Sequence, residues 1–365
     1  MRSISCKIPV IKQEGFYMLS VIGVIVVFSI VILVHELGHF FMARHMGVKV
    51  ERFALGLGKV LLSKKIGDTE YAICLIPFGG YVKMAGDDLT DKPSTNRREF
   101  FGQPPGRRFW IIFAGVAVNY IFAFIIFSFI VPTSRIGVVI EDMPAYRSGI
   151  ETGDKITAID GKEVKYWYQV LNFISKDYDA KPLKISIDRD GVISEHVITP
   201  AILESKGLFG KEIKTPKVGI SYFGDVEVLK GGPVKHLVVG ASQTFANTAL
   251  TYKFIWYLIT GKVALKGSAT GPVGIAVILG KAIKVGAVYL IYLVAHINLA
   301  LAIFNLLPFP VLDGGHILFL GVEKIRRRPL SVKVQEVIQY IAVTLIIAFF
   351  LLVTWNDISV WILKR

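Results

Sequence analysis

The fold is decided by an uncharged apolar run that ends in a pair of histidines. Residues 15–40 read GFYMLSVIGVIVVFSIVILVHELGHF, and Glu36 is the first charged side chain among them. A helix needs about 20 apolar residues to cross a bilayer, so 15–34 is long enough. The run could instead be a signal peptide, but it lacks a small-x-small cleavage site and leads straight into His35. We therefore predict a transmembrane helix over 16–45.

The motif at the end of this run suggests a metal site. His35 and His39 lie four residues apart, so on a helix both imidazoles can reach one zinc ion. Glu36 can then act on the metal-bound water, whose pKa zinc lowers to about 7. Alternatively, hydrogen bonds between helices satisfy these side chains. Because ionisable groups are costly in apolar segments, we predict that His35 and His39 are ligands and that Glu36 is catalytic.

A second motif offers a third ligand. A catalytic zinc ion usually has three protein ligands and one open position. Residues 305–315 read NLLPFPVLDGG and end the third apolar run, with Asp313 as its acid. The two prolines should break the helix here, which is tolerated at membrane depth where the backbone lines a cavity. Asp313 could simply be an interfacial charge, but beside the first motif we expect it to be the third ligand.

The composition also indicates a membrane protein. Hydrophobic residues make up 53% and charged residues 19%, against about 25% charged residues in soluble domains. The net charge is +14, yet residues 135–235 hold 15 basic and 15 acidic side chains. The excess is therefore on the apolar part, which is typical of membrane-flanking loops and not of nucleic-acid binding. With only Cys6 and Cys74, a disulfide framework or a cysteine metal cluster is excluded.

The apolar runs divide the chain into segments. We predict transmembrane helices over 16–45, 107–131, 286–318 and 334–356, a β-region over 46–106, an inserted domain over 135–228, and amphipathic membrane-surface helices over 231–284. In the last segment Gln243, Asn247 and Thr251 share one helical face, and spanning is the alternative. In the inserted domain, Asp160-Gly161 between apolar residues predicts a hairpin, and the alternation over 183–187 predicts a half-buried strand.

Loop charge predicts the orientation. Residues 46–108 carry 11 Lys and Arg, and 323–333 carry five, so both loops should be cytoplasmic. The three basic residues before Gln13 argue weakly for the opposite orientation. The histidines and Asp313 end the first and third spans, so they should meet near the cytoplasmic edge. A further span over 236–262 would separate them, which favours the surface placement of that segment.

Together the two motifs resemble the paired signatures of the site-2 protease family of intramembrane zinc metalloproteases, in particular the bacterial branch that cleaves anti-sigma factors. The resemblance covers nearly the whole chain after about residue 16. It implies a Zn²⁺ ion on His35, His39 and Asp313, with Glu36 as the catalytic glutamate. It also implies that Asn305 helps to position the substrate.

The resemblance continues outside the motifs. Residues 48–84 are similar to the membrane-dipping β-hairpin of this branch, where Gly56-Leu57-Gly58 stands for the usual Gly-Phe-Gly. Gly56 and Gly58 could face the substrate or simply form turns. Residues 144–164 resemble a PDZ domain, of which one copy is evident. Asn119 matches the family's Gly-Pro-x-x-Asn-Phe, although Val116 and Tyr120 replace its proline and phenylalanine.

We therefore expect an α-helical polytopic membrane protein with about four transmembrane helices, a membrane-associated β-hairpin and one inserted PDZ-like β-domain. The implied activity is hydrolysis of a peptide bond within the transmembrane segment of a single-span membrane protein, such as an anti-sigma factor or a signal peptide. A site-1-type protease would act first. The implied location is the bacterial inner membrane, with the PDZ domain and both termini periplasmic.

Two functions remain as alternatives. A non-proteolytic PDZ adaptor would be favoured if Glu36 or a ligand were missing, and none is missing. A zinc transporter would need ionisable residues along several spans, whereas here they cluster at one depth. We do not expect His45, His296 or His316 to be ligands. The basic residues over 323–333 should set the topology and contact anionic lipids.

Overall fold

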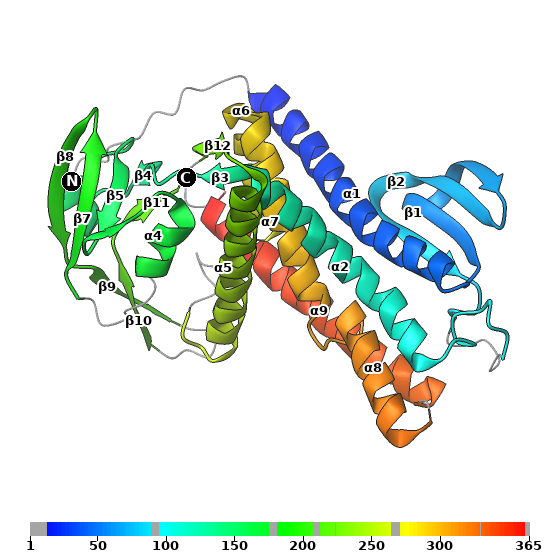
Figure 1. Ribbon diagram of the computed structural model, residues 1–365. Helices are drawn as coiled ribbons and strands as arrows, with labels where there is room; N and C mark the ends of the chain where they lie inside the picture. The colour runs from blue at the N-terminus through cyan, green and yellow to red at the C-terminus, as the bar shows by residue number, and fades with distance from the viewer. Residues whose placement is uncertain are drawn as a thin grey trace. The chain divides into compact units, whose positions relative to one another are not determined.

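The computed structural model describes residues 13–88, 95–174, 181–206, 212–222, 224–263, 271–328 and 330–361 (Figure 1). Within these residues the helices are α1 Gln13–His45, α2 Pro105–Phe129, α3 Pro144–Arg147, α4 Trp167–Ile174, α5 Pro233–Ile259, α6 Pro272–Val285, α7 Ala287–Asn305, α8 Asp313–Arg326 and α9 Val332–Trp361. The strands are β1 Val50–Ile66, β2 Thr69–Met84, β3 Ile130–Pro132, β4 Val138–Val139, β5 Lys155–Ile159, β6 Lys162–Glu163, β7 Leu183–Arg189, β8 Val192–Ile198, β9 Ala201–Lys206, β10 Glu212–Lys217, β11 Ile220–Ser221 and β12 Val226–Val228.

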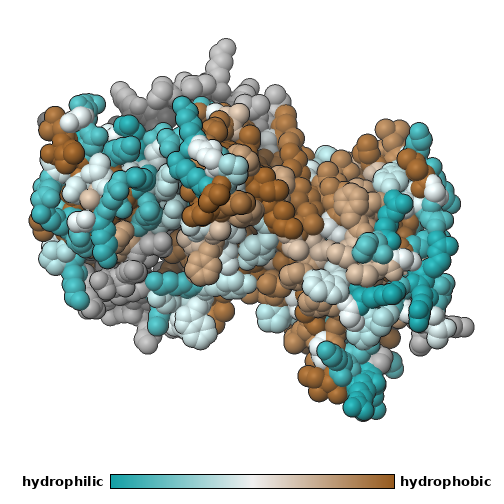
Figure 2. Space-filling model, in the orientation of Figure 1, coloured by the Kyte–Doolittle hydropathy of each residue, from teal (hydrophilic) through white to brown (hydrophobic). Residues whose placement is uncertain are grey.

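The chain forms two compact units. The first unit comprises Met1–Asn119, Thr270–Gly286 and Phe304–Arg365, and the second comprises Tyr120–Ala269 and Ala287–Ile303. Among the described helices, four are long and apolar enough to cross a membrane: Ile22–His45, Pro105–Phe129, Ala287–Asn305 and Val332–Ile358. Apolar surface follows the long helices, and polar surface is more frequent on the strands, although β1, β2 and β8 also expose apolar side chains such as Leu62 and Val192 (Figure 2).

Within the third predicted span, over 286–318, the structure has two helices, and the break lies at the two prolines where the sequence indicates it. Helix α7 ends at Asn305 and α8 begins at Asp313. The segment between them contains Pro308 and Pro310, which lack the backbone donors that a continuing helix needs. The turn is tight, because a Cβ on Gly314 would lie 2.2 Å from the carbonyl oxygen of Leu307.

In the first unit, α1 packs against β2 and α6. Strand β1 pairs with β2 twice. Its residues 52–55 lie between two arms of β2, since Phe53 pairs with both Val82 and Tyr71, and Lys64 pairs with Tyr71 again. The two long strands therefore build a small sheet in the order 80–84, 50–55, 69–74, 60–66. The end of this sheet at Val50 packs on α1 through a core that includes Phe40 and Ala43.

The α6–α9 junction of the first unit rests on a buried carboxylate. Asp357 of α9 is 1% exposed, and its oxygens accept hydrogen bonds from the backbone N–H groups of Gly271, at 3.0 Å, and Gly274, at 2.8 Å. N–H groups at the start of a helix have no partner within the helix, and the N-cap residue of α6 has no side-chain cap. Asp357 supplies the missing acceptors. A Cβ on Gly271 would lie 2.6 Å from Val353, so the close approach requires glycine.

The second unit contains a small domain with its own core. Its main sheet has the order β6-β5-β7-β8. The predicted hairpin is present, with Ile159 paired to Lys162 and with Asp160 and Gly161 at positive φ. The predicted alternation in β7 is also present, because Ile185 and Ile187 are buried in this core.

A buried acid in this domain is fully paired. Asp154 is 2% exposed and accepts hydrogen bonds from Arg189 at 2.7 and 2.8 Å and from the backbone N–H of Glu151 at 2.8 Å. Burial alone would raise the pKa of Asp154, but these hydrogen bonds outweigh it and hold the pKa below its ordinary value.

One residue of the polar stripe of α5 packs into the protein. Gln243 is fully buried, and its Nε2 donates to the carbonyl oxygens of Phe127, at 2.7 Å, and Ile130, at 3.1 Å, at the end of α2. The exposed face is apolar instead, with Phe245 at 77% and Trp256 at 60% exposure. Gln243 therefore pairs free carbonyl groups at a helix end, and periodicity alone does not distinguish this role from contact with water.

Candidate metal centre

Two glycines let the helices that frame the site approach each other closely. A Cβ on Gly38 of α1 would lie 2.4 Å from the carbonyl oxygen of Ala114 in α2. A Cβ on Gly115 would lie 2.4 Å from Nε2 of His39 and 2.8 Å from Cε1 of His35. Since real Cβ contacts are never so short, both positions need glycine. The absent Cβ of Gly115 leaves the space into which both imidazoles fit.

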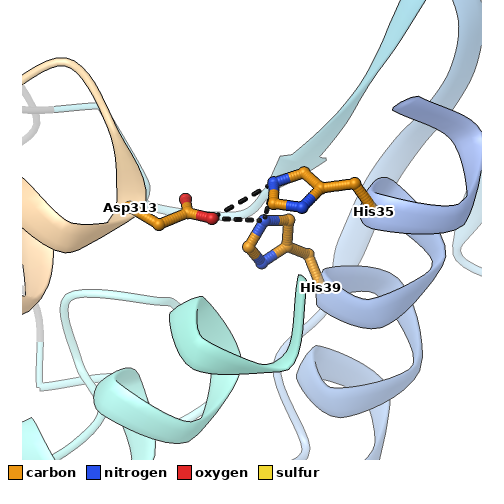
Figure 3. Close-up of side chains that lie close together, drawn as sticks. All are labelled: His35, His39 and Asp313. Atoms are coloured by element: carbon orange, nitrogen blue, oxygen red, sulfur yellow. Dashed lines mark hydrogen bonds and ion pairs between the residues drawn. The ribbon is translucent and has the colours of Figure 1, made fainter. Parts of the chain in front are cut away.

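The three predicted ligands meet at one point (Figure 3). Nε2 of His35 lies 3.1 Å from Nε2 of His39, and Oδ2 of Asp313 lies 3.1 Å from the first and 3.5 Å from the second. A tetrahedral zinc ion with bonds of about 2.0–2.1 Å places its ligand atoms about 3.3–3.4 Å apart. The donor set and its spacing therefore fit zinc.

The His39 ring is oriented by the backbone of α2. Its Nδ1 lies 2.9 Å from the carbonyl oxygen of Ile111, which can only accept a hydrogen bond. The proton of the neutral imidazole is thus on Nδ1, and the lone pair of Nε2 points at the other two ligand atoms. The contact with Ile111 therefore favours the tautomer that a metal ligand requires, and the ring is only 9% exposed.

The acid reaches the histidines because α8 begins with it. Leu312 is the N-cap residue, and Asp313 occupies the first turn of α8. The same helix is tied to the start of α2 by an ion pair of 2.5 Å between Arg108 and Glu323, with Arg108 largely buried. Arg108 also donates from Nε to the carbonyl oxygen of Gln103. These contacts fix the helix that carries the third predicted ligand.

Glu36 lies between the site and the sheet. Its carboxylate accepts a hydrogen bond from the backbone N–H of Val82 in β2, and its Cγ lies 3.8 Å from the position of a Cβ on Gly80. On the other side, Nδ2 of Asn305 lies 3.2 Å from Nε2 of His35. The structure therefore brings both Glu36 and Asn305 to the cluster, each from a different element.

Gly56 and Gly58 lie in the sheet, where β1 bends. Their φ angles are +88° and +85°, and a Cβ on Gly56 would lie 2.5 Å from the carbonyl oxygen of Ile76. At this bend the chain leaves the 50–55 arm for the 60–66 arm. The bend accounts for both glycines, and contact with substrate stays a prediction.

The other histidines lie outside the cluster. His45 is exposed. His296 lies between aromatic rings, 4.8 Å from Phe127 and 4.5 Å from Tyr292 between centroids, and its Nδ1 lies 3.1 Å from the carbonyl oxygen of Tyr292. In the described part of the chain, the one group of three potential metal ligands is His35, His39 and Asp313. Of the basic residues of 323–333, Lys324 and Arg326 lie in α8, Lys333 lies in α9, and Arg327 and Arg328 follow α8.

Sequence reasoning missed the contributions of α2. Ile111 acts through its carbonyl group, which has no signature in a sequence. The sequence singles out Asn119 only as part of a motif, whose glycine is Gly115. Their spacing of four residues was a usable signal, because it places both on one helical face toward the histidine helix.

Comparisons with known proteins support a peptidase. The model of the family described as Peptidase family M50 matches residues 23–349. A Campylobacter jejuni protein with "zinc metalloprotease" in its name is 34% identical over 352 residues, which cover 94% of each chain. Zinc metalloprotease RasP of Geobacillus kaustophilus is 28% identical over 423 residues, which cover 93% of this chain and 98% of that protein.

A solved structure also matches part of the chain. The PDZ domain of an SdrC-like protein from Listeria monocytogenes is 24% identical, with coverage of 24% of this chain and 84% of that domain, at a TM-score of 0.20. This likeness is too weak to assign a fold.

Proposed function

We propose, since the chain belongs to peptidase family M50 and is a multi-pass membrane protein, that this intramembrane zinc metalloprotease holds its ion with His35, His39 and Asp313. The observation that carries the assignment is the meeting of two imidazole nitrogens and one carboxylate oxygen within 3.1–3.5 Å. The ligands come from α1 and α8, and the space for them is provided by Gly115 of α2.

Glu36 is the proton carrier of the reaction. A zinc ion in this site would supply a Lewis acid that activates water and polarises the scissile carbonyl. Glu36 takes the proton of the attacking water and passes it to the leaving amine. The backbone N–H of Val82 holds its carboxylate in place. Asn305 lies beside His35 and is placed to orient the peptide.

The substrate is a transmembrane helix that unwinds locally, because an intact helix uses its own backbone donors and acceptors. The 80–84 arm of β2 is suited to hold the unwound segment. One of its edges pairs with 50–55, while the N–H of Val82 points to Glu36. An extended peptide added along this edge would lie beside the catalytic carboxylate.

The inserted domain over 135–228 acts as a PDZ-like filter that obstructs substrates with bulky external domains. A first cut by a site-1-type protease then makes the substrate, a single-span protein such as an anti-sigma factor or a signal peptide, short enough to enter. Deletion of 136–226 should let the enzyme cut full-length substrate. Reduced cleavage of the shortened substrate would instead indicate capture of its new C-terminus, and unchanged selectivity would refute both ideas.

The proposed location is the bacterial inner membrane. The basic residues around β1, β2 and the α8–α9 loop would face the cytoplasm and contact anionic lipids. The zinc site would then lie near the cytoplasmic side, and the inserted domain and both termini in the periplasm. Protease accessibility of tags at 190 and at 328 in spheroplasts tests this orientation.

The activity is tested with purified protein and single-span membrane substrates. Cleavage should stop on addition of a zinc chelator and return with Zn²⁺. His35→Ala should be inactive at the same zinc concentration, whereas His45→Ala, which changes an exposed histidine on the same helix, should cleave normally. Cleavage that survives in His35→Ala would refute the proposed site, and binding of substrate without cleavage by the wild type would favour the adaptor.

A further inference from the structure

The amide of Asn119 is buried next to His35 with half of its hydrogen-bonding capacity unused. Asn119 lies in α2 and is 0% exposed. Its Nδ2 lies 3.5 Å from Nδ1 of His35, and its Oδ1 is buried without a hydrogen-bond partner. A buried acceptor without a donor costs free energy, so the amide has a reason to turn toward a donor.

The proposed metal site provides that donor. His35 faces the other two ligands with Nε2, so binding a metal through this atom requires a neutral ring with its proton on Nδ1. With Nδ2 of Asn119 toward the ring, an N–H donor of the amide would then face the Nδ1–H donor of His35. Half a turn about the Cβ–Cγ bond of Asn119 brings the unused Oδ1 to Nδ1–H instead.

We propose that Asn119 is a positioning residue whose Oδ1 accepts a hydrogen bond from Nδ1–H of His35, which fixes the ring and tautomer that present Nε2 to zinc. The inference rests on the proposed zinc site. Its role would match that of the Ile111 carbonyl group, which lies 2.9 Å from Nδ1 of His39. Metal-bound histidines generally donate their second N–H to such an acceptor.

The spacing along α2 supports this assignment. Ile111, Gly115 and Asn119 follow one another at intervals of four residues, so they share one face of the helix. The first accepts from His39, the second leaves space for both rings, and the third lies against His35. One helical face would thus orient both imidazoles, with one acceptor for each.

The test measures zinc affinity and not only activity. Full-length protein in detergent is stripped of metal and titrated with Zn²⁺ against a chromogenic chelator. Asn119→Leu keeps the size of the side chain but removes the acceptor, and it should weaken affinity by about 10–100-fold. Asn119→Asp keeps an acceptor at the same place and should bind zinc nearly as tightly as the wild type.

The matched control is Asn298→Leu, which removes another fully buried asparagine from a membrane helix. Asn298 donates to the carbonyl oxygen of Val294 in its own helix at 3.0 Å, so its loss should leave zinc affinity unchanged. Thermal unfolding of the metal-free proteins separates folding from binding. A merely structural Asn119 would lower the melting temperature in Asn119→Leu while the folded protein kept its affinity.

Two results would overturn the proposal: wild-type affinity in Asn119→Leu, or equal loss in Asn119→Leu and Asn119→Asp. If Asn119→Leu does not fold, the zinc affinity of Asn119→Asp decides alone. An aspartate carboxylate can accept but not donate a hydrogen bond, so wild-type affinity supports the acceptor role and a loss of affinity refutes it. His35→Ala is measured alongside. Wild-type affinity in His35→Ala would refute the zinc site itself, which is a different outcome from the failure of Asn119.

Discussion

The first unit contains two aspartates, one buried and one half-buried, whose carboxylates have opposite kinds of partner. Asp357, at the α6–α9 junction, accepts two backbone N–H groups and is 1% exposed. Oδ2 of Asp313 instead faces two imidazole nitrogens that also face each other. A buried carboxylate that accepts backbone N–H groups is typical of a structural role. A carboxylate that faces two imidazole nitrogens is suited to hold an ion, so the kind of partner distinguishes the two roles.

The largest effect should follow from a change that leaves the ligands intact. Glu36→Gln removes a proton acceptor but none of the proposed ligands, so cleavage should fall by at least about 10²–10⁴-fold while zinc stays bound. Metal analysis and a cleavage assay on the same preparation measure both quantities. Substantial residual activity would remove Glu36 from its role as general base.

The next effect concerns the acid among the metal-binding atoms. Asp313→Asn replaces a carboxylate with a poorer, neutral ligand, so zinc affinity should fall by more than the about 10–100-fold that loss of an outer hydrogen bond costs. Chelator competition gives the affinity. Equal zinc content in mutant and wild type at limiting Zn²⁺ would show that Asp313 is no ligand.

The same substitution at the other aspartate should act on stability alone. Asp357→Asn replaces one acceptor oxygen by a donor that faces an N–H group at the start of α6, at a cost of about 1–3 kcal/mol. Zinc affinity should not change, because Asp357 lies among backbone donors and not metal ligands. Thermal unfolding in detergent checks the first expectation and chelator competition the second. Loss of zinc here would break the distinction between the two aspartates.

The smallest effect should appear in the second unit and depend on pH. The pKa of Asp154 is lowered in the folded state, so its contribution is complete above the unfolded pKa of about 3.9 and is lost as pH falls through the lower folded value. Asp154→Asn should therefore destabilise the domain at pH 7, and by less near pH 2. Hydrogen exchange of β5 and β7, corrected for the intrinsic rate at each pH, measures the difference. A constant difference at both pH values would contradict the expectation.

How far the sequence predicted the site depended on which atoms act. His35, Glu36 and His39 were predictable because their spacing encodes a shared helical face. The prediction of Asp313 required the second motif and the argument that the first and third spans end at the same face of the membrane. The hydrogen bonds of Ile111, Val82 and the start of α6 involve backbone groups, which every residue has, so no pattern reveals them.

The fold was predictable where hydrophobicity and turn chemistry decide it. The positions of the long apolar helices and the Asp160-Gly161 hairpin agree with the structure. The doubled pairing of β1 with β2 was not foreseen, because both arms of β2 satisfy the same alternation. The polar residues of α5 share one face, as their spacing predicts. The pairing of Gln243 with free carbonyl groups of α2 was not predictable, because a polar face that packs on such groups has the same period as one that faces water.

The long separation between the proposed ligands has a consequence for biosynthesis. His39 and Asp313 are 313 − 39 = 274 residues apart, and the turn that presents Asp313 forms only after α7 has ended. A nascent chain that has inserted its first two spans has both histidines and Glu36 but no third ligand. The ribosome must therefore translate past Asp313 before the proposed site can close, so a chain that terminates before this residue should lack hydrolytic activity in the membrane.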